Sequence, residues 1–349
     1  FLLLSIRRIN TRSFFYLCVI DKMGVKWDAI RMKNSCITIA LLGLLGGCTA
    51  PRVDRQKITE LLIDVRSEIV VIDPVSHDFL DWSDVMLHIK KADVVLLGEL
   101  HDHVIGHAVQ LAIVEDVMDK YPGSVLALEM LERDEQMLVD DFMEGILTAR
   151  SLENLTHSAD WGASGGWGAW YQPILEATKE RGGEVVAANA PRRYVRLART
   201  DGYERIDALP QNRRSLIDYP EELSGGRYRE RFWEFAMHDG DAEIVRVDVS
   251  SIAPDDPVLP VFRSQQVWDA TMAQSVVNAD PTLSKKVVLL VGQFHVEYNG
   301  GLVQEIKKRN PDLSIVVVSI QREIPEEDWR GTKTSPPIAD LMIVETINE

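Results

Sequence analysis

Two segments far apart in the chain carry the same pattern, and this repeat constrains the fold more than any other feature. Val94–His101 and Val287–His295 each begin with a short apolar run rich in β-branched residues, which is typical of a buried strand. Each run is followed by glycine, a carboxyl or amide residue, an apolar residue and histidine. Side chains just past the carboxyl ends of parallel strands project into the crevice above the sheet. We therefore predict that Glu99, His101 and His295 meet at one crevice.

Other apolar runs extend this sheet. Further strands are expected at 68–73, 124–130, 184–190, 314–319 and 339–345, and helical spacing at 82–91, 102–120, 174–181 and 301–309. The alternation predicts an α/β fold, a mostly parallel sheet flanked by helices. Two stretches without a buried-strand run, about 132–172 and 193–285, are expected to form helical insertions, the second an inserted helical subdomain within the domain 67–349.

Polar residues also follow the other expected strands. Glu129 ends the run at 124–130, and Asn189 and Arg192 follow the run at 184–190. A histidine beside a carboxylate can act as a general base with its orienting partner, or the pair can ligate a divalent metal. The alternative is that these are ordinary strand ends whose histidines cap neighbouring carbonyls. The candidates for catalysis are Glu99, His101, Glu129 and His295, and those for metal binding are His101 and His295.

Two more features belong to this region. His103 and His107 are spaced i, i+4, so both could face one ligand from a helix turn. Residues 160–173 combine four glycines with three tryptophans and a tyrosine, which predicts either a flexible lid over a planar ligand or a surface loop held by its tryptophans. The chain has no His-Glu-x-x-His, no Gly-x-Ser-x-Gly and no phosphate-binding glycine loop. A site that activates water or binds a ligand remains.

The first 48 residues have the character of a targeting segment. Lys33 gives a positive start, residues 36–45 are apolar, and Leu45–Cys48 is typical of a bacterial lipoprotein signal with Cys48 as the lipidated residue. We expect residues 1–47 to be upstream sequence and signal peptide, and residues 48–66 to form a tether. Thr49 is not the aspartate of a retention signal, which favours the outer membrane.

Cysteine count and charge exclude several classes. The other two cysteines, Cys18 and Cys36, precede the expected cleavage point, so the mature chain can have neither a disulfide nor thiol catalysis. The net charge is −16, and because the first 47 residues are basic it becomes −21 for the rest. Such a surface repels nucleic acid and acidic lipid, so acyl chains rather than a basic patch would hold the protein on a membrane.

As a set, these motifs resemble the ChaN-like family of iron-regulated, haem-binding lipoproteins. That family is similar to a wider Gly-Glu-x-His group, which includes erythromycin-esterase-like hydrolases and the Tiki metalloproteases. The residues that carry the resemblance are Leu96–Asp102 with His107, Leu126–Met130, Tyr171–Pro173, Ala188–Arg192, Gln266–Asp269 with Met272, and Val291–His295.

The resemblance implies haem as ligand, a role in iron acquisition at the cell envelope, a homodimer formed on haem binding and an outer-membrane haem receptor as partner. It also implies a tyrosine ligand to the iron, since a phenolate can bind ferric haem. Tyr203 and Tyr194 are the candidates, with packing at the edge of the helical subdomain as the alternative. With His107, Asn189 and Arg192, the family motifs place Gln266 and Asp269 in the pocket. A metal- or water-dependent hydrolase is the alternative function, and a scaffold protein without either activity is a third.

Overall fold

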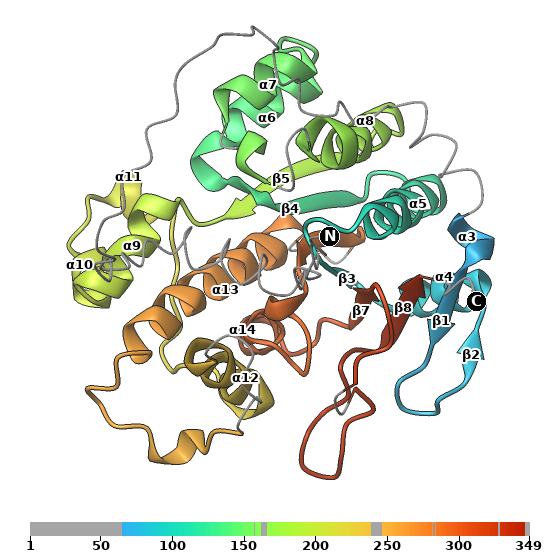
Figure 1. Cartoon of the computed structure of the whole chain (residues 1–349). Helices are drawn as coiled ribbons and strands as arrows, with labels where there is room; N and C mark the ends of the chain where they lie inside the picture. Colours follow the sequence, from blue (N-terminus) through green and yellow to red (C-terminus); the bar gives the residue numbers. More distant parts are fainter. Residues whose placement is uncertain are drawn as a thin grey trace, which may run out of the picture.

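The computed structural model describes residues 65–156, 158–161, 166–238, 246–280, 282, 284–326 and 329–345. The expected signal peptide, Cys48 and nearly all of the tether lie outside these residues. Within them, eight strands form one sheet in the order β2-β1-β8-β7-β3-β6-β4-β5 (Figure 1). The strands are β1 Ile69–Ile72, β2 Phe79–Leu80, β3 Val94–Glu99, β4 Val125–Glu132, β5 Glu184–Asn189, β6 Val287–Gly292, β7 Ile315–Gln321 and β8 Leu341–Glu345.

Six neighbouring strands of this sheet, from β8 to β5, run parallel. Only β1 reverses direction, pairing antiparallel with β8 on one side and with β2 on the other. The central strands β3 and β6 are buried along their whole length. Strands covered on both faces read as continuous apolar runs, which is why they could be located in the sequence. The predicted α/β class with a mostly parallel sheet is confirmed.

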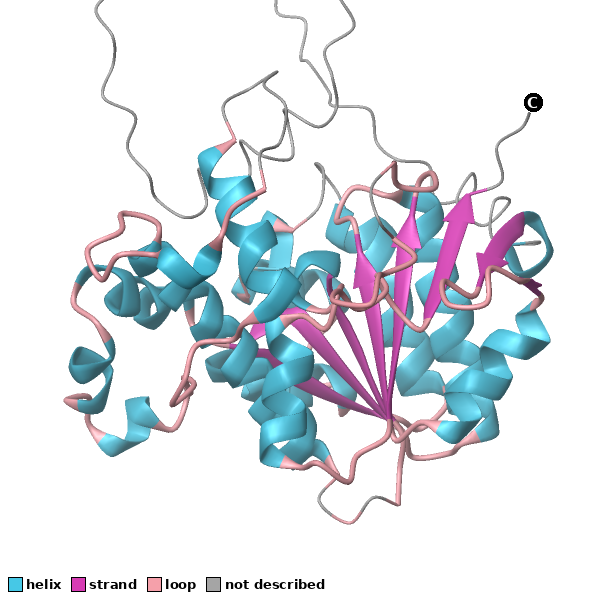
Figure 2. Ribbon diagram, turned by 90° about the horizontal axis from the view of Figure 1, so that it is seen from below, coloured by secondary structure: helices cyan, strands magenta, loops and turns pink. Residues whose placement is uncertain are grey.

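Helices cover both faces of the sheet, as Figure 2 shows with the strands seen along their length. One apolar core lies between the sheet and α4, α5 and α8, and the other lies between the sheet and α13 and α14. The helix α4 begins where expected, because Asp81 and Asp84 form a reciprocal capping box at its start. The bounds of these helices and of the short α3 are α3 Val65–Glu68, α4 Trp82–Lys91, α5 Val104–Lys120, α8 Gln172–Glu180, α13 Leu259–Ala279 and α14 Gly301–Arg309.

The remaining helices lie between β4 and β5 and between β5 and β6. The described residues from 190 to 286 contain no strand, and their helices pack on the left of Figure 1 around two small apolar clusters. No described helix has the length and apolar character needed to cross a bilayer. The elements are η1 Arg133–Glu135, α6 Gln136–Met143, α7 Ala149–Leu155, η2 Ser158–Asp160, η3 Trp167–Tyr171, α9 Arg192–Thr200, α10 Tyr203–Asp207, α11 Gln211–Arg214, α12 Gly226–Met237, η4 Val249–Ser251 and, after β6, η5 Gln293–His295.

Candidate functional site

The two repeated segments lie side by side. Strands β3 and β6 pair in parallel and in step, so that Glu99 is opposite Gly292 at the carboxyl edge of the sheet. A side chain at Gly292 would intrude between the neighbours, because its Cβ would lie 3.3 Å from His101 Nε2 and 3.4 Å from Glu129 Oε2. The glycine therefore leaves space in which His101, just past β3, and Glu129, within β4, come together.

Glu99 is the centre of one half of the site. Its buried carboxylate accepts hydrogen bonds from Tyr171 Oη and Gln110 Nε2, both at 2.5 Å, and lies 2.6 Å from His101 Nδ1. Burial alone would raise the pKa of Glu99, but the hydrogen bond from His101 and the charge of His107 outweigh it and lower the pKa. Burial and the nearby Glu99 raise the pKa of Tyr171 well above its ordinary value, so Tyr171 stays a phenol that donates to the carboxylate.

His107 contacts the residues that surround Glu99 and His101. Its buried ring stacks on Trp170 with centroids 4.7 Å apart, Nδ1 lies 3.0 Å from Gln110 Oε1, and Nε2 lies 3.2 Å from the His101 carbonyl oxygen. The contact to Gln110 orients the amide that donates to Glu99. His107 therefore positions the site without opening into it.

The expectation that His103 and His107 face one ligand is wrong. Helix α5 starts at Val104, so His103 is its N-cap residue with extended backbone angles, and the i, i+4 spacing does not apply across that point. His103 instead contacts the end of β8, where its Nε2 lies 3.4 Å from Glu345 Oε2.

The second half of the site is a histidine held between two carboxylates. His295 Nδ1 lies 2.6 Å from Asp269 Oδ1, and His295 Nε2 lies 3.5 Å from Glu129 Oε1. The other oxygen of Glu129 accepts the Gly292 backbone N–H at 2.6 Å. Burial opposes charge on both groups, yet Glu129 and Asp269 raise the pKa of His295 to about 10 and His295 lowers that of Glu129 to about 2. The histidine is therefore an imidazolium at neutral pH.

Asp269 is held in turn by Tyr228 of α12 and by Gln266 of its own helix, α13. Its Oδ2 accepts the Tyr228 hydroxyl at 2.5 Å and Gln266 Nε2 at 2.9 Å, and Gln266 Oε1 accepts the Ser224 backbone N–H at 2.6 Å. Burial raises the pKa of Asp269 despite the opposing charge of His295. Sequence reasoning missed Tyr228 because nothing in its local pattern points to a residue 41 positions away.

An aromatic side chain lies over the first half of the site. Trp161 meets the His101 ring edge-on with centroids 4.9 Å apart, and the Arg192 guanidinium lies 5.1 Å from the Trp161 ring. The predicted flexible loop is wrong for Trp167–Tyr171, which forms a π-helix with buried aromatic rings. Burial of those rings against α5 and α8 outweighs the freedom that glycine gives the backbone; residues 162–165 lie outside the described part.

Asn189 and Arg192 border the site and brace it. Asn189 Nδ2 donates to the Glu129 carbonyl oxygen at 2.8 Å, and the Arg192 backbone N–H donates to Glu132 Oε1 at 3.2 Å. Asn189 thus ties β5 to the end of β4 at the point where Glu129 enters the site.

The two tyrosines predicted to bind haem lie elsewhere, on α9 and at the start of α10. Tyr203 donates its hydroxyl to the Arg263 carbonyl oxygen at 3.0 Å and stacks on Tyr219 with centroids 4.4 Å apart. Burial raises the pKa of Tyr203. Tyr194 packs against the same small apolar cluster, with the Arg193 guanidinium 4.6 Å from its ring.

Among the described residues, no three histidine, cysteine, aspartate or glutamate side chains are arranged to hold a metal ion. The His101 side chain is 22 % exposed, against 1 % for Glu99 and 8 % for His295. Chemically, the first half is a histidine–carboxylate pair suited to accept a proton, and the second half is a fixed positive charge.

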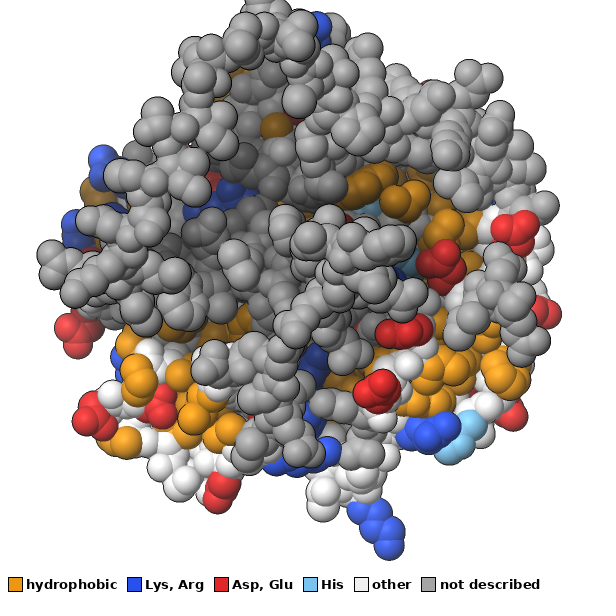
Figure 3. Space-filling model, viewed as in Figure 1, with side chains coloured by type: hydrophobic (Ala, Val, Ile, Leu, Met, Phe, Trp, Pro, Cys, Tyr) orange, Lys and Arg blue, Asp and Glu red, His pale blue; other side chains and the backbone are white. Residues whose placement is uncertain are grey.

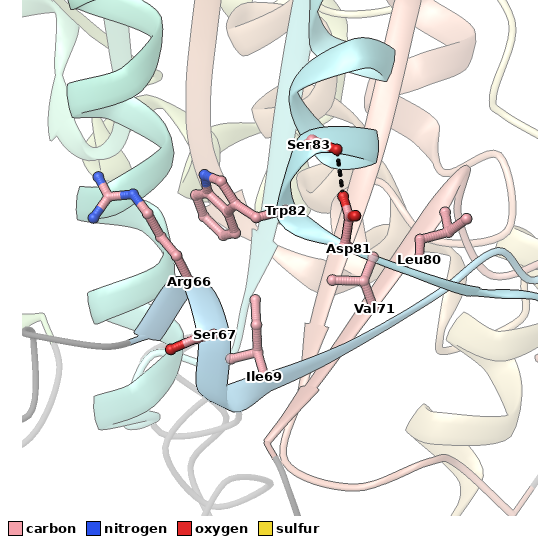
Figure 4. A pocket seen from close by; sticks show the side chains of 8 residues that line it. All are labelled: Arg66, Ser67, Ile69, Val71, Leu80, Asp81, Trp82 and Ser83. Carbon is pink, nitrogen blue, oxygen red and sulfur yellow. Dashed lines mark hydrogen bonds between the residues drawn. The ribbon is translucent and has the colours of Figure 1, made fainter.

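A surface hollow of about 510 Å³ lies away from this cluster, beside β1 and β2 (Figure 4). Trp82 forms part of its wall and is fixed there by its Nε1 donating to Asp116 Oδ2 at 2.7 Å. None of the predicted site residues lines this hollow. Its lining residues are Arg66, Ser67, Ile69, Val71, Leu80, Asp81, Trp82 and Ser83.

The fold and the site together define an α/β protein with a buried histidine–carboxylate cluster assembled from two Gly-x-x-His strand ends. The chain belongs to the family described as haem-binding uptake, Tiki superfamily, ChaN, which matches residues 85–306. This confirms the resemblance found in the sequence.

Three other proteins are similar to this chain. A structure described as cofacial haem binding to ChaN of Campylobacter jejuni superposes with a TM-score of 0.56 at 20% identity, covering 80% of this chain and 98% of the other, so the two share a fold. An erythromycin esterase variant in its open conformation aligns with a TM-score of 0.38 at 14% identity, covering 69% of this chain and 74% of the other. Protein RETICULATA-RELATED 5, chloroplastic, of Arabidopsis thaliana is 25% identical over 225 residues, 62% of this chain and only 28% of the plant protein.

Proposed function

We propose that this protein binds haem and serves haem or iron acquisition at the bacterial cell envelope. The observation that carries the proposal is membership of a haem-binding family over residues 85–306. The Campylobacter jejuni protein that shares the fold is described as binding haem cofacially. A homodimer formed on haem binding and an outer-membrane haem receptor are parts of the same proposal.

The helical subdomain has side chains that fit haem. Haem supplies ferric iron, which takes an axial side-chain ligand, and a flat apolar ring with two carboxylates. Residues 191–219 contain seven arginines and four acidic residues in a chain of net charge −16, and basic side chains show at the left margin of Figure 3, over α9 to α11. Tyr194 and Tyr203 stay the candidate iron ligands. For Tyr203 to bind iron, its hydroxyl would have to leave the Arg263 carbonyl oxygen.

Titration of the purified protein with hemin tests haem binding. We expect a saturable shift of the Soret band, because a ligated haem in an apolar site absorbs differently from hemin in water. A featureless rise in absorbance that matches free hemin would contradict the proposal.

Lipid anchoring at Cys48, with an outer-membrane address, completes the proposal. It is supported by the sequence Leu45–Cys48 and the Thr49 that follows. When cells are grown with a labelled fatty acid, the wild-type protein should carry the label, whereas Cys48→Ser should not. On fractionation, the wild-type protein should be recovered with the outer membranes. Label retained by Cys48→Ser would refute lipidation at this residue.

A hydrolase is the second candidate, because haem bound on α9 to α11 would not use the buried histidines and carboxylates at the carboxyl edge of the sheet. His101, backed by Glu99, could accept a proton from water while the His295 imidazolium faces the negative charge that develops on the substrate. Turnover of p-nitrophenyl acetate above the buffer blank should fall by about 10²-fold or more in His101→Ala and stay unchanged in His88→Ala. Equal rates for wild type and His101→Ala would remove this candidate.

A divalent metal would belong to that same activity. The described residues offer no group of three donors, so a metal would rest on His101 and on a His295 that gives up its proton, with ligands from elsewhere. Metal content of protein purified without chelator, compared with His101→Ala and His295→Ala, decides this: a stoichiometric metal lost in both variants supports it, and a metal-free wild type refutes it.

A further inference from the structure

Helix α9 has one basic face and one apolar face. Arg192, Arg196 and Arg199 follow one another at i, i+4 and i+7, so they share a face. Val195 and Ala198 are buried on the other side, in the small apolar cluster of the subdomain. The arginine face is therefore turned away from the subdomain core, and Arg196 is exposed.

Two arginines of this face have no counter-charge. In the part of the chain that the structure describes, no carboxylate lies within 4.0 Å of Arg196 or Arg199. The next arginine on the helix, Arg193, differs, because it pairs with Asp134 at 2.5 Å. Burial and the charge of Arg196 lower the pKa of Arg199. Two like charges one helical turn apart destabilise a helix, and an anion bound between them would relieve the repulsion.

The face also leads toward the strand-end cluster. It begins at Arg192, whose guanidinium lies 5.1 Å from the ring of Trp161, and Trp161 lies against His101. Tyr194 lies on the opposite side of the helix, with Val195 and Ala198, so it does not share this face. A ligand on the arginine face would therefore carry its anionic groups away from Tyr194.

We infer that Arg196 and Arg199 bind the two propionate carboxylates of haem. This inference rests on the proposed haem binding, and it names the groups that hold the anionic edge of the ligand. Guanidinium–carboxylate pairs are charge-assisted and often bidentate, and Arg is well suited to them because its donors form a planar fork. The inference and its test make no use of an iron ligand, although the position of Tyr194 on the opposite side of α9 favours Tyr203 over Tyr194.

A cycle of two proteins and two ligands tests it. The wild type and Arg196→Ala/Arg199→Ala are titrated with hemin and with hemin dimethyl ester, in which the propionates carry no charge. We expect the double variant to bind hemin about 10- to 100-fold more weakly, as for the loss of charge-assisted hydrogen bonds, and to bind the ester as the wild type does. Arg150→Ala/Arg330→Ala removes the same charge from exposed positions outside the subdomain and should stay within about 3-fold of the wild type.

The outcomes separate the inference from the function on which it rests. A wild type that binds neither ligand refutes haem binding itself. A wild type that binds hemin, with a double variant that binds it equally well, overturns only the inference. An equal loss for hemin and its ester, or an equal loss in the control pair, also overturns it, because the effect would not come from the propionates. Arg196→Gln/Arg199→Gln, which removes the charge but keeps an unbranched polar side chain of good helix propensity, repeats the test should the alanine variant not fold.

Discussion

At the scale of single residues, the molecule keeps a charged histidine in its interior. His295 lies between Glu129 and Asp269 with its side chain 8 % exposed. Burying one ion alone is very unfavourable, so the three groups depend on one another. Removing His295 would leave two carboxylates close together without a cation, and we expect the variant to be strongly destabilised.

The stability of this group should depend on pH in a defined way. The folded pKa of His295 is raised from 6.5 to about 10, so its contribution is complete below pH 6.5 and is lost as the pH rises toward 10. The folded pKa of Glu129 is lowered from 4.5 to about 2, so its contribution is complete above pH 4.5 and is lost as the pH falls toward 2. Together they stabilise the fold most between pH 4.5 and 6.5.

His295→Ala should therefore lower the free energy of unfolding by about 3–5 kcal/mol near pH 6 and flatten its decline between pH 6.5 and 10. Urea unfolding at a series of pH values measures both effects. His88→Ala, on α4 outside the cluster, should keep the wild-type profile. An unchanged alkaline decline in His295→Ala would show that other groups cause it.

Strand-end positions identified part of the site, and the family motifs added His107, Gln266 and Asp269, which lie on helices. Glu99 ends β3, Glu129 lies in the second half of β4 and His295 comes three residues after β6, so the segment around each strand predicts their positions. Gln110 and Tyr228 come from helices and reach the site through packing, which no local spacing encodes. A buried carboxylate needs donors, so the existence of such partners could be expected but not their identity.

At the scale of elements, the approach of α14 to α13 depends on a glycine. Gly301 begins α14, and a methyl group there would overlap Asp269 Oδ2 and lie 2.7 Å from a carbon of the Tyr228 ring. The glycine allows the first turn of α14 to pack directly against the carboxylate that holds His295. Backbone position and site geometry are therefore coupled at this residue.

Gly301→Ala should displace Asp269 and lower the free energy of unfolding by about 1–3 kcal/mol. Gly168→Ala is the matched control, because no atom lies within 4 Å of the added Cβ and its backbone is helical. The control should be neutral or stabilising by up to about 1 kcal/mol, since alanine favours a helix. Thermal unfolding of both variants measures the difference in stability. Equal stability of Gly301→Ala and Gly168→Ala would mean that α14 can move away from Asp269 without loss of stability.

Elements were predictable where one signal dominated. The apolar runs located β3 and β6, and the helical spacing at 82–91 located α4. The π-helix Trp167–Tyr171 was not predictable, because its glycine-rich composition indicates a loop while the burial of its rings is decided by α5 and α8. Short segments follow their tertiary contacts rather than their composition.

At the scale of the whole molecule, an open sheet has two edges that could pair with another chain. One edge strand, β2, is only two residues long. At the other edge, the side-chain amide of Gln136 makes hydrogen bonds with the free backbone edge of β5. Its Nε2 donates to the Val185 carbonyl oxygen at 2.9 Å, and its Oε1 accepts the Ala187 N–H at 2.7 Å. This amide satisfies backbone groups that a second molecule could otherwise bind.

Gln136→Ala should free both groups of β5, lower the free energy of unfolding by about 1–3 kcal/mol and increase self-association. Chemical unfolding and light scattering at several protein concentrations measure the two effects. Gln211→Ala, at an exposed position on α11, should change neither. A variant that is less stable yet shows no added self-association would mean that the exposed edge is protected by other means.

The position of β3 between β6 and β7 has a consequence for biosynthesis. Val94 pairs with Val287 on one side and with Ile315 on the other, so both neighbours of this central strand are translated long after it. In a nascent chain that ends before residue 287, the apolar central strand has neither of its pairing partners. Such an unpaired apolar segment is prone to aggregation and is bound by chaperones. The ribosome must finish most of the protein before the cluster at the sheet edge can exist at all.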